Sequence, residues 1–113
     1  MSVFRAFEIE AIKLLGTDTL GEDVVSAVIL DATFVGFKHS GVGYFLTIRH
    51  PSLPIARHIL SKPIVVGSIG QVCGSYLAFV ERNELVLEYA GTTDVPSNIR
   101  DLHVQIQVAA GAR

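Results

Sequence analysis

Residues 76–89 read YLAFVERNELVLEY, with two apolar runs on either side of a short polar segment. Residues 76–80 and 85–89 are rich in the aromatic and branched side chains that favour strands. The polar residues between them are typical of a tight turn, and Asn83 tolerates the left-handed backbone conformation that such turns use. The stretch therefore predicts a β-hairpin.

Further strands are predicted on both sides of this hairpin. Residues 24–37 are dense in β-branched and aromatic side chains, and Asp31 is interpreted there as a bulge or a solvent-facing position. Residues 42–50 alternate in part, so the two runs form a second hairpin. Residues 63–67 are typical of a short buried strand, and residues 103–108 alternate strictly between apolar and polar.

One helix is predicted, over residues 3–16, because its apolar residues recur at helical spacing. Ser2 is the expected N-cap and Gly16 the expected C-terminal residue. A strand is the alternative for this segment. Residues 55–60 are expected to form a helical turn, and the glycine-rich residues 67–74 are expected to form a loop.

The links between these strands are too short for the helical crossovers that parallel strands need. We therefore expect an α+β fold in which an N-terminal helix packs on a mostly antiparallel, curved sheet of about six strands. Residues 1–113 are expected to form a single domain, with a frayed tail over residues 109–113.

Composition excludes several classes of function. Half of the 113 residues are apolar, which excludes disorder, and the net charge of −2 excludes a strongly basic nucleic-acid binder. Cys73 is the single cysteine and cannot form an intramolecular disulfide. The longest apolar runs fall far short of the roughly 20 residues of a membrane span, and no secretory signal begins the chain. We expect a cytoplasmic protein without membrane or direct nucleic-acid contacts.

The histidines do not have the spacing of a metal site, and neither a metal nor a cofactor is expected. The four are His39, His50, His58 and His103. The pairs Arg49-His50 and Arg57-His58 flank a proline-bounded loop. If that loop folds back, they could bind phosphate or cleave RNA without a metal, so a small ribonuclease or phosphoester-handling enzyme is the alternative function.

Other reactive patterns are weaker. Asp31, His39 and Ser40 lack the order of a nucleophile elbow, and Cys73 is expected to be a half-buried structural thiol. No catalytic residue is therefore predicted.

The acidic residues indicate a binding surface. Glu81, Glu84 and Glu88 cluster around the predicted hairpin, with Tyr76 and Tyr89 beside them as candidate interface aromatics. A second candidate patch is formed by Asp18, Glu22 and Asp23, which are expected to share a loop. An acidic face of this kind attracts a basic partner. A homo-oligomer is a third possibility, marked by an apolar strand edge at residues 104–108.

Short segments spread over residues 30–108 carry a resemblance to a known class. They are residues 41–47, 53–54, 84–88, 95–96 and 100–101. In size, strand order and turn residues the chain resembles small bacterial immunity proteins of polymorphic-toxin and contact-dependent growth-inhibition systems. The resemblance implies a cytosolic protein that binds a cognate toxin domain, in many cases a nuclease, and blocks its active site or substrate path.

Overall fold

The computed structural model describes residues 3–109 of the chain. Two helices come first, and six strands with one short 3-10 helix follow. The elements are α1 (Ala6–Leu20), α2 (Glu22–Asp31), β1 (Thr33–His39), β2 (Gly43–Arg49), β3 (His58–Ile69), β4 (Val72–Glu81), β5 (Glu84–Gly91), η1 (Ile99–Asp101) and β6 (Gln105–Val108).

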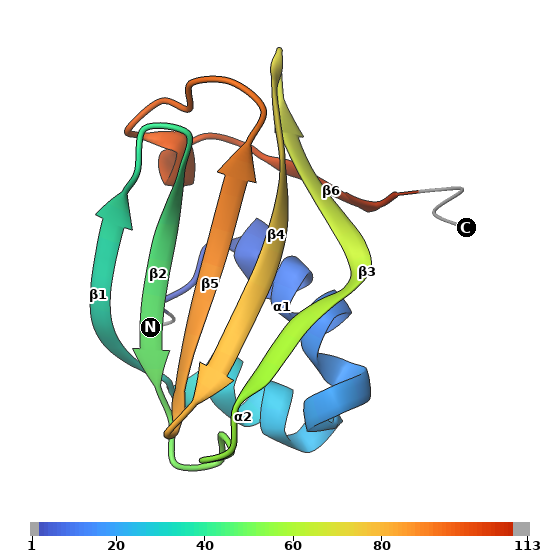
Figure 1. The fold of residues 1–113 in the computed structure, drawn as a ribbon, viewed down its shortest axis with the longest axis vertical. Coiled ribbons are helices and arrows are strands. Elements are labelled where there is room, and N and C mark those ends of the chain that lie inside the picture. The colour runs from blue at the N-terminus through green and yellow to red at the C-terminus, as the bar shows by residue number, and fades with distance from the viewer. Residues whose placement is uncertain (1–2, 110–113) are drawn as a thin grey trace.

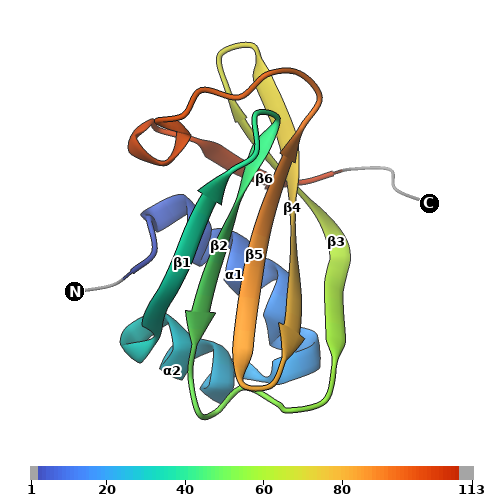
Figure 2. The ribbon, with the colours of Figure 1, turned by 60° about the vertical axis from the view of Figure 1, so that its left-hand side comes forward.

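The strands form one open sheet in the order β1-β2-β5-β4-β3-β6, and every neighbouring pair is antiparallel. Both helices lie behind this sheet, and its other face is turned toward the viewer in Figure 1 without a covering layer. Helix α1 packs on β3, β4 and β6, and α2 packs on α1 (Figure 2). The predicted α+β class, with an N-terminal helix on an antiparallel sheet, is confirmed.

The hairpin predicted from residues 76–89 is present as β4 and β5. Arg82 and Asn83 form the two-residue turn, with φ of 54° and 63°. Positive φ at both central residues gives the turn the twist that antiparallel strands require. The Asn83 side chain donates a hydrogen bond to the carbonyl oxygen of Leu53 at 2.6 Å, which ties the turn to the preceding loop.

The prediction of a strand over residues 24–37 is confirmed for residues 33–37 and is wrong for residues 24–31. Residues 24–31 belong to α2, and the strand β1 begins at Thr33. Val25 and Val28 are buried at helical spacing, and Glu22 and Asp23 stabilise the first turn of a helix. Packing against α1 thus overrides the β propensity of the valines. Asp31 ends α2, and the bulge of β1 lies between Phe34 and Gly36.

The N-terminal helix is present but shifted along the chain. It begins at Ala6 and continues through Gly16 to Leu20. Gly16 is buried at the contact with Val25 of α2, where a side chain would be crowded, and the residue with positive φ is Gly21. The role expected of Ser2 lies outside the described residues, as do residues 110–113 of the tail.

Two predictions about β3 are wrong. Residues 58–60 are not a helical turn, since Ile59 lies opposite Phe79 in the sheet. Residues 67–74 are not a loop, because Gly67 pairs with Gly74 and leaves only a tight turn at Gly70 and Gln71. Residues in strands were mistaken for irregular structure because glycine and proline occur inside them.

The core lies between the sheet and the helices. Strands β2, β4 and β5 each contribute every second residue to it, and α1 contributes one apolar stripe. The buried apolar residues of these three strands are Tyr44, Leu46, Ile48, Tyr76, Ala78, Val80, Leu85, Leu87 and Tyr89. The alternate residues of the same strands consequently make up the uncovered face.

Candidate functional site

The uncovered face consists of the outward-facing side chains of β2, β4 and β5. Strand register places these side chains in rows that cross the sheet, and three of the rows carry the larger side chains. The rows are Phe45, Glu88 and Leu77; Thr47, Val86 and Phe79; and Arg49, Glu84 and Glu81. The first two rows are mainly apolar, and the third, at the β4–β5 turn, is charged.

The apolar part of this face is only half-buried. Phe45, Leu77, Phe79 and Val86 are covered in part by their neighbours in the sheet and by no other layer. Beside the turn, Phe79 and Val86 form the floor of a hollow of about 450 Å³. Its other lining residues are Arg49, Glu81, Arg82 and Glu84. An apolar floor with a charged rim is the usual arrangement of a protein interface.

The charged row is only partly neutralised within the chain. Arg49 Nη2 donates to Glu84 Oε2 at 2.5 Å. Glu81 lies opposite Glu84 in the register, is exposed, and forms no ion pair within residues 3–109. Arg82 lines the same end of the face, so two arginines and two glutamates lie together there.

Tyr76 and Tyr89 do not belong to this surface, which corrects the prediction that they lie at an interface. Their side chains point to the other side of the sheet and are 2% and 1% exposed. The signal was present in the sequence, because residues of odd separation along a strand face opposite ways. Glu81 and Glu88 therefore could not share a face with Tyr76 and Tyr89, respectively.

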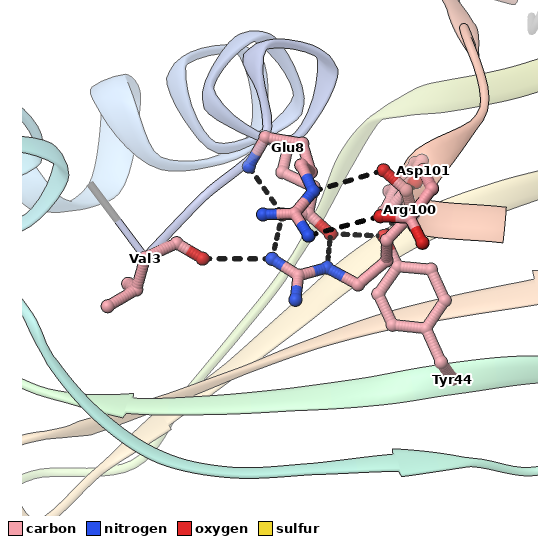
Figure 3. Close-up of polar contacts among 7 residues, drawn as sticks. Val3, Glu8, Tyr44, Arg100 and Asp101 are labelled. Atoms are coloured by element: carbon pink, nitrogen blue, oxygen red, sulfur yellow. Dashed lines mark hydrogen bonds and ion pairs between the residues drawn. The ribbon is translucent and has the colours of Figure 1, made fainter. Parts of the chain in front are cut away.

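A buried polar network occupies the core side instead, and sequence reasoning missed it. Glu8 of α1 is fully buried and accepts hydrogen bonds from Arg100 Nε, from Arg100 Nη2 and from the Tyr44 hydroxyl (Figure 3). Arg100 also donates to the carbonyl oxygen of Val3, and the Tyr44 and Tyr76 hydroxyls are 2.9 Å apart. Glu8 shares a helical stripe with buried Ala11, Ile12 and Leu15, and that position was the available signal.

The Glu8 carboxylate of this network is fully buried and hydrogen-bonded, so we assign the network a structural role. Burial raises the pKa of Tyr44, and the Tyr76 and Glu8 groups raise it further. Burial would lower the pKa of Arg100, but its hydrogen bonds to Glu8 and the Glu8 charge outweigh that effect and raise it. Within residues 3–109, every buried side-chain nitrogen and oxygen has a hydrogen-bond partner.

The second acidic patch lies in the helical layer, away from the uncovered face. Asp18 belongs to α1, whereas Glu22 and Asp23 form the first turn of α2, so the three do not share a loop as expected. All three are exposed. Glu22 and Asp23 line a hollow of about 500 Å³ together with Lys13. Their charges already have a structural role at the N-terminus of α2.

The first pair of the arginine–histidine cluster expected for the alternative function is divided between the two sides of the sheet. Arg49 is on the uncovered face in its ion pair with Glu84, whereas His50 is 6% exposed and packs on the core side. His50 Nδ1 accepts the N–H of Ser52, and its Nε2 lies 4.0 Å from Asp31 Oδ2.

Cys73 is exposed, which corrects the expected half-buried thiol. The His39 ring forms hydrogen bonds with the Val95 carbonyl oxygen and with the Gly41 N–H. These bonds hold the β1–β2 turn against the loop that follows β5. Residues 3–109 contain no group of three or more His, Cys, Asp or Glu side chains placed to hold a metal ion. No helix in that range has the length and apolar character needed to cross a membrane.

Comparison with known proteins found no matching family model, no matching curated protein and no matching solved structure.

Proposed function

We propose that this protein is a non-catalytic binding protein, an immunity protein that blocks a cognate bacterial toxin domain by stoichiometric occlusion in the cytoplasm. The uncovered face of the sheet is the proposed binding surface. The observation that carries the proposal is the combination on this face of two apolar rows with one charged row.

In this proposal, burial of the two apolar rows slows dissociation of the complex. An antiparallel sheet can leave one face to solvent, but that face is then normally polar. Here Phe45, Leu77, Phe79 and Val86 occupy its centre. Covering them with a partner removes apolar surface from water at about 25 cal/mol per Å².

In this proposal, the charged row raises the rate of association with the toxin domain. Arg49 compensates one carboxylate, Glu84, while Glu81 and Glu88 stay without an ion pair within residues 3–109. Arg82 at the turn moderates the negative potential. A toxin domain with a basic surface, as nucleases have, fits this balance.

The test uses the purified chain and the toxin domain encoded beside its gene. We expect a one-to-one complex by calorimetry and loss of toxin activity at equimolar ratio. Glu81→Lys is expected to slow association about tenfold at low salt, because it reverses the uncompensated charge. Glu10→Lys makes the same charge change at an exposed position of α1 and serves as the matched control.

Three results would contradict the proposal. The first is a toxin domain that neither binds nor loses activity. The second is an association rate that Glu10→Lys lowers as much as Glu81→Lys does. The third is catalytic turnover by the purified chain itself.

A further inference from the structure

We propose that the outer edge of strand β1 binds an extended segment of a partner protein, which adds one strand to the sheet and places an acidic side chain opposite Lys38. The chemistry that this edge recognises is an extended main chain on which apolar and acidic side chains alternate. The inference concerns the edge of the sheet and holds for a partner of any activity, so it goes beyond the function proposed above.

The main chain of β1 offers hydrogen-bonding groups on its outer side. Within residues 3–109, β1 pairs with β2 alone, and it is the outermost strand in Figure 1. The Ser40 N–H donates to the Gly43 carbonyl oxygen of the strand pair. Because hydrogen-bonded and non-hydrogen-bonded positions alternate along an antiparallel pair, the backbone groups of Lys38 face β2, and those of Phe37 and His39 face outward. These outward N–H and C=O groups are a template for another strand.

The helix side of this edge calls for an apolar residue on the added strand. Phe37 lies opposite the buried Leu46, so its ring is on the helix side of the sheet, where it remains 40% exposed. Within residues 3–109, three of the nine large exposed hydrophobic side chains lie on β1, and they are Phe34, Val35 and Phe37. An apolar side chain opposite Phe37 would continue the core by one strand and remove part of this surface from water.

The other side of the same edge calls for a carboxylate. Lys38 lies opposite Phe45, so it extends the row of Phe45, Glu88 and Leu77 on the uncovered face by one strand. It is exposed and has no ion pair in the described part of the chain. A carboxylate directly opposite Lys38 would form a cross-strand ion pair. Since successive residues of a strand point to opposite faces, the added segment alternates between apolar and acidic side chains.

A second copy of the chain does not supply this chemistry. Two copies paired along this edge would bring Lys38 of one against residues 32–43 of the other, and these residues contain no Asp or Glu. In the register that pairs both Lys38 residues, the two ammonium groups repel each other. Charge complementarity therefore favours a different chain as the occupant.

The opposite edge of the sheet is less suited, which corrects the apolar strand edge expected at residues 104–108. Strand β6 has only four residues, Val104 before it is buried, and Ile106 packs against the core. Val108 alone is a large exposed hydrophobic residue there. The part of β3 that β6 does not cover carries Lys62 followed by a proline, and both residue types oppose the addition of a strand.

The experiment is backbone amide exchange by NMR on the full chain, with the capped synthetic peptide Thr-Val-Glu-Val-Thr as the probe. In the free chain we expect the Lys38 amide to be protected and the Phe37 and His39 amides to exchange rapidly. Saturation with the peptide is expected to protect Phe37 and His39. The matched peptide Thr-Val-Lys-Val-Thr is expected to bind about fivefold more weakly, because it places a like charge opposite Lys38.

Charge-reversed variants separate this contact from general attraction. Lys38→Glu is expected to reverse the preference between the two peptides. Lys62→Glu makes the same charge change at an exposed position of β3 and is expected to leave the preference unchanged. Circular dichroism verifies that both variants are folded.

Four results would overturn the proposal. The first is that no peptide concentration protects the Phe37 and His39 amides. The second is a peptide preference that Lys38→Glu does not change, and the third is one that Lys62→Glu reverses equally. The fourth is protection of the two amides without peptide as the chain concentration rises, which would make a second copy the occupant. None of these measurements uses the toxin domain, so they are distinct from the test of the proposed function.

Discussion

Arg100 holds both carboxylate oxygens of Glu8, with Nε 2.7 Å from Oε2 and Nη2 2.7 Å from Oε1, across 92 positions of the sequence. The pair joins the first turn of α1 to the 3-10 helix η1 on the helix side of the sheet. The guanidinium also lies over the ring of Phe37, 5.6 Å from its centroid. The Glu8–Arg100 pair thereby connects the start of α1 with the 3-10 helix η1, far along the chain.

Arg100→Met is expected to destabilise the fold by about 3–5 kcal/mol, because it leaves the Glu8 carboxylate buried without its cation. The matched control is Arg5→Met, which removes the exposed ion pair with Asp101 and the exposed hydrogen bond to the Arg100 carbonyl oxygen, and which is expected to cost about 1 kcal/mol or less. Urea unfolding of both variants measures the difference. Equal losses in the free energy of unfolding would contradict the larger contribution expected of the buried pair.

Alkaline pH is expected to unfold the protein. Burial raises the pKa of Tyr89 to about 12 from the ordinary value of 10.0, and it raises the pKa values of Tyr44 and Tyr76 as well. Because the unfolded chain releases these protons first, their contribution to stability is complete below pH 10.0 and is lost as the pH rises through the raised values.

The Tyr89→Phe variant isolates one of these groups. It loses the hydrogen bond to the Gly67 carbonyl at every pH, a cost of about 1 kcal/mol. Above pH 10.0 its free energy of unfolding should fall less steeply than that of the wild type, by one proton's slope. Identical slopes for the two proteins between pH 10.0 and 12 would contradict the assignment.

Gly43→Ala is expected to prevent stable folding, because a Cβ there would overlap the Tyr89 carbonyl oxygen on the neighbouring strand. Such an overlap needs a shift of paired backbone, and losses above about 4 kcal/mol follow from changes of that kind. Gly36→Ala, also within a strand but with open space around it, is expected to raise stability by about 0.5 kcal/mol. Thermal unfolding compares the two, and a tolerated Gly43→Ala would show that the strands separate easily.

The β4–β5 turn supplies the last pair of variants. Asn83→Ala removes the bond to Leu53 and puts alanine at positive φ, with an expected loss of about 2 kcal/mol. Arg82→Asn places a residue suited to positive φ at the first turn position and is expected to add about 0.5 kcal/mol. Changes of the same sign in both variants would show that backbone conformation does not control this turn.

Local patterns alone determined the antiparallel sheet and its central hairpin. The strand-favouring composition of residues 76–80 and 85–89 is a property of neighbouring residues, and the short turn between them makes the two strands each other's nearest partners. The grouping of Glu81, Glu84 and Glu88 on one side of the hairpin follows from the same period of two. Short links between strands excluded parallel pairing, and this excluded most other architectures.

Tertiary structure alone decided which residues are buried, paired or left at an edge. Residues 24–31 have the composition of a strand, and only packing on α1 makes them a helix. Glu8 and Arg100 meet because the fold brings distant segments together at a point where a charge without a partner would be too costly to bury. The exposure of β1 likewise follows from its place at the end of the strand order, which no local sequence pattern encodes.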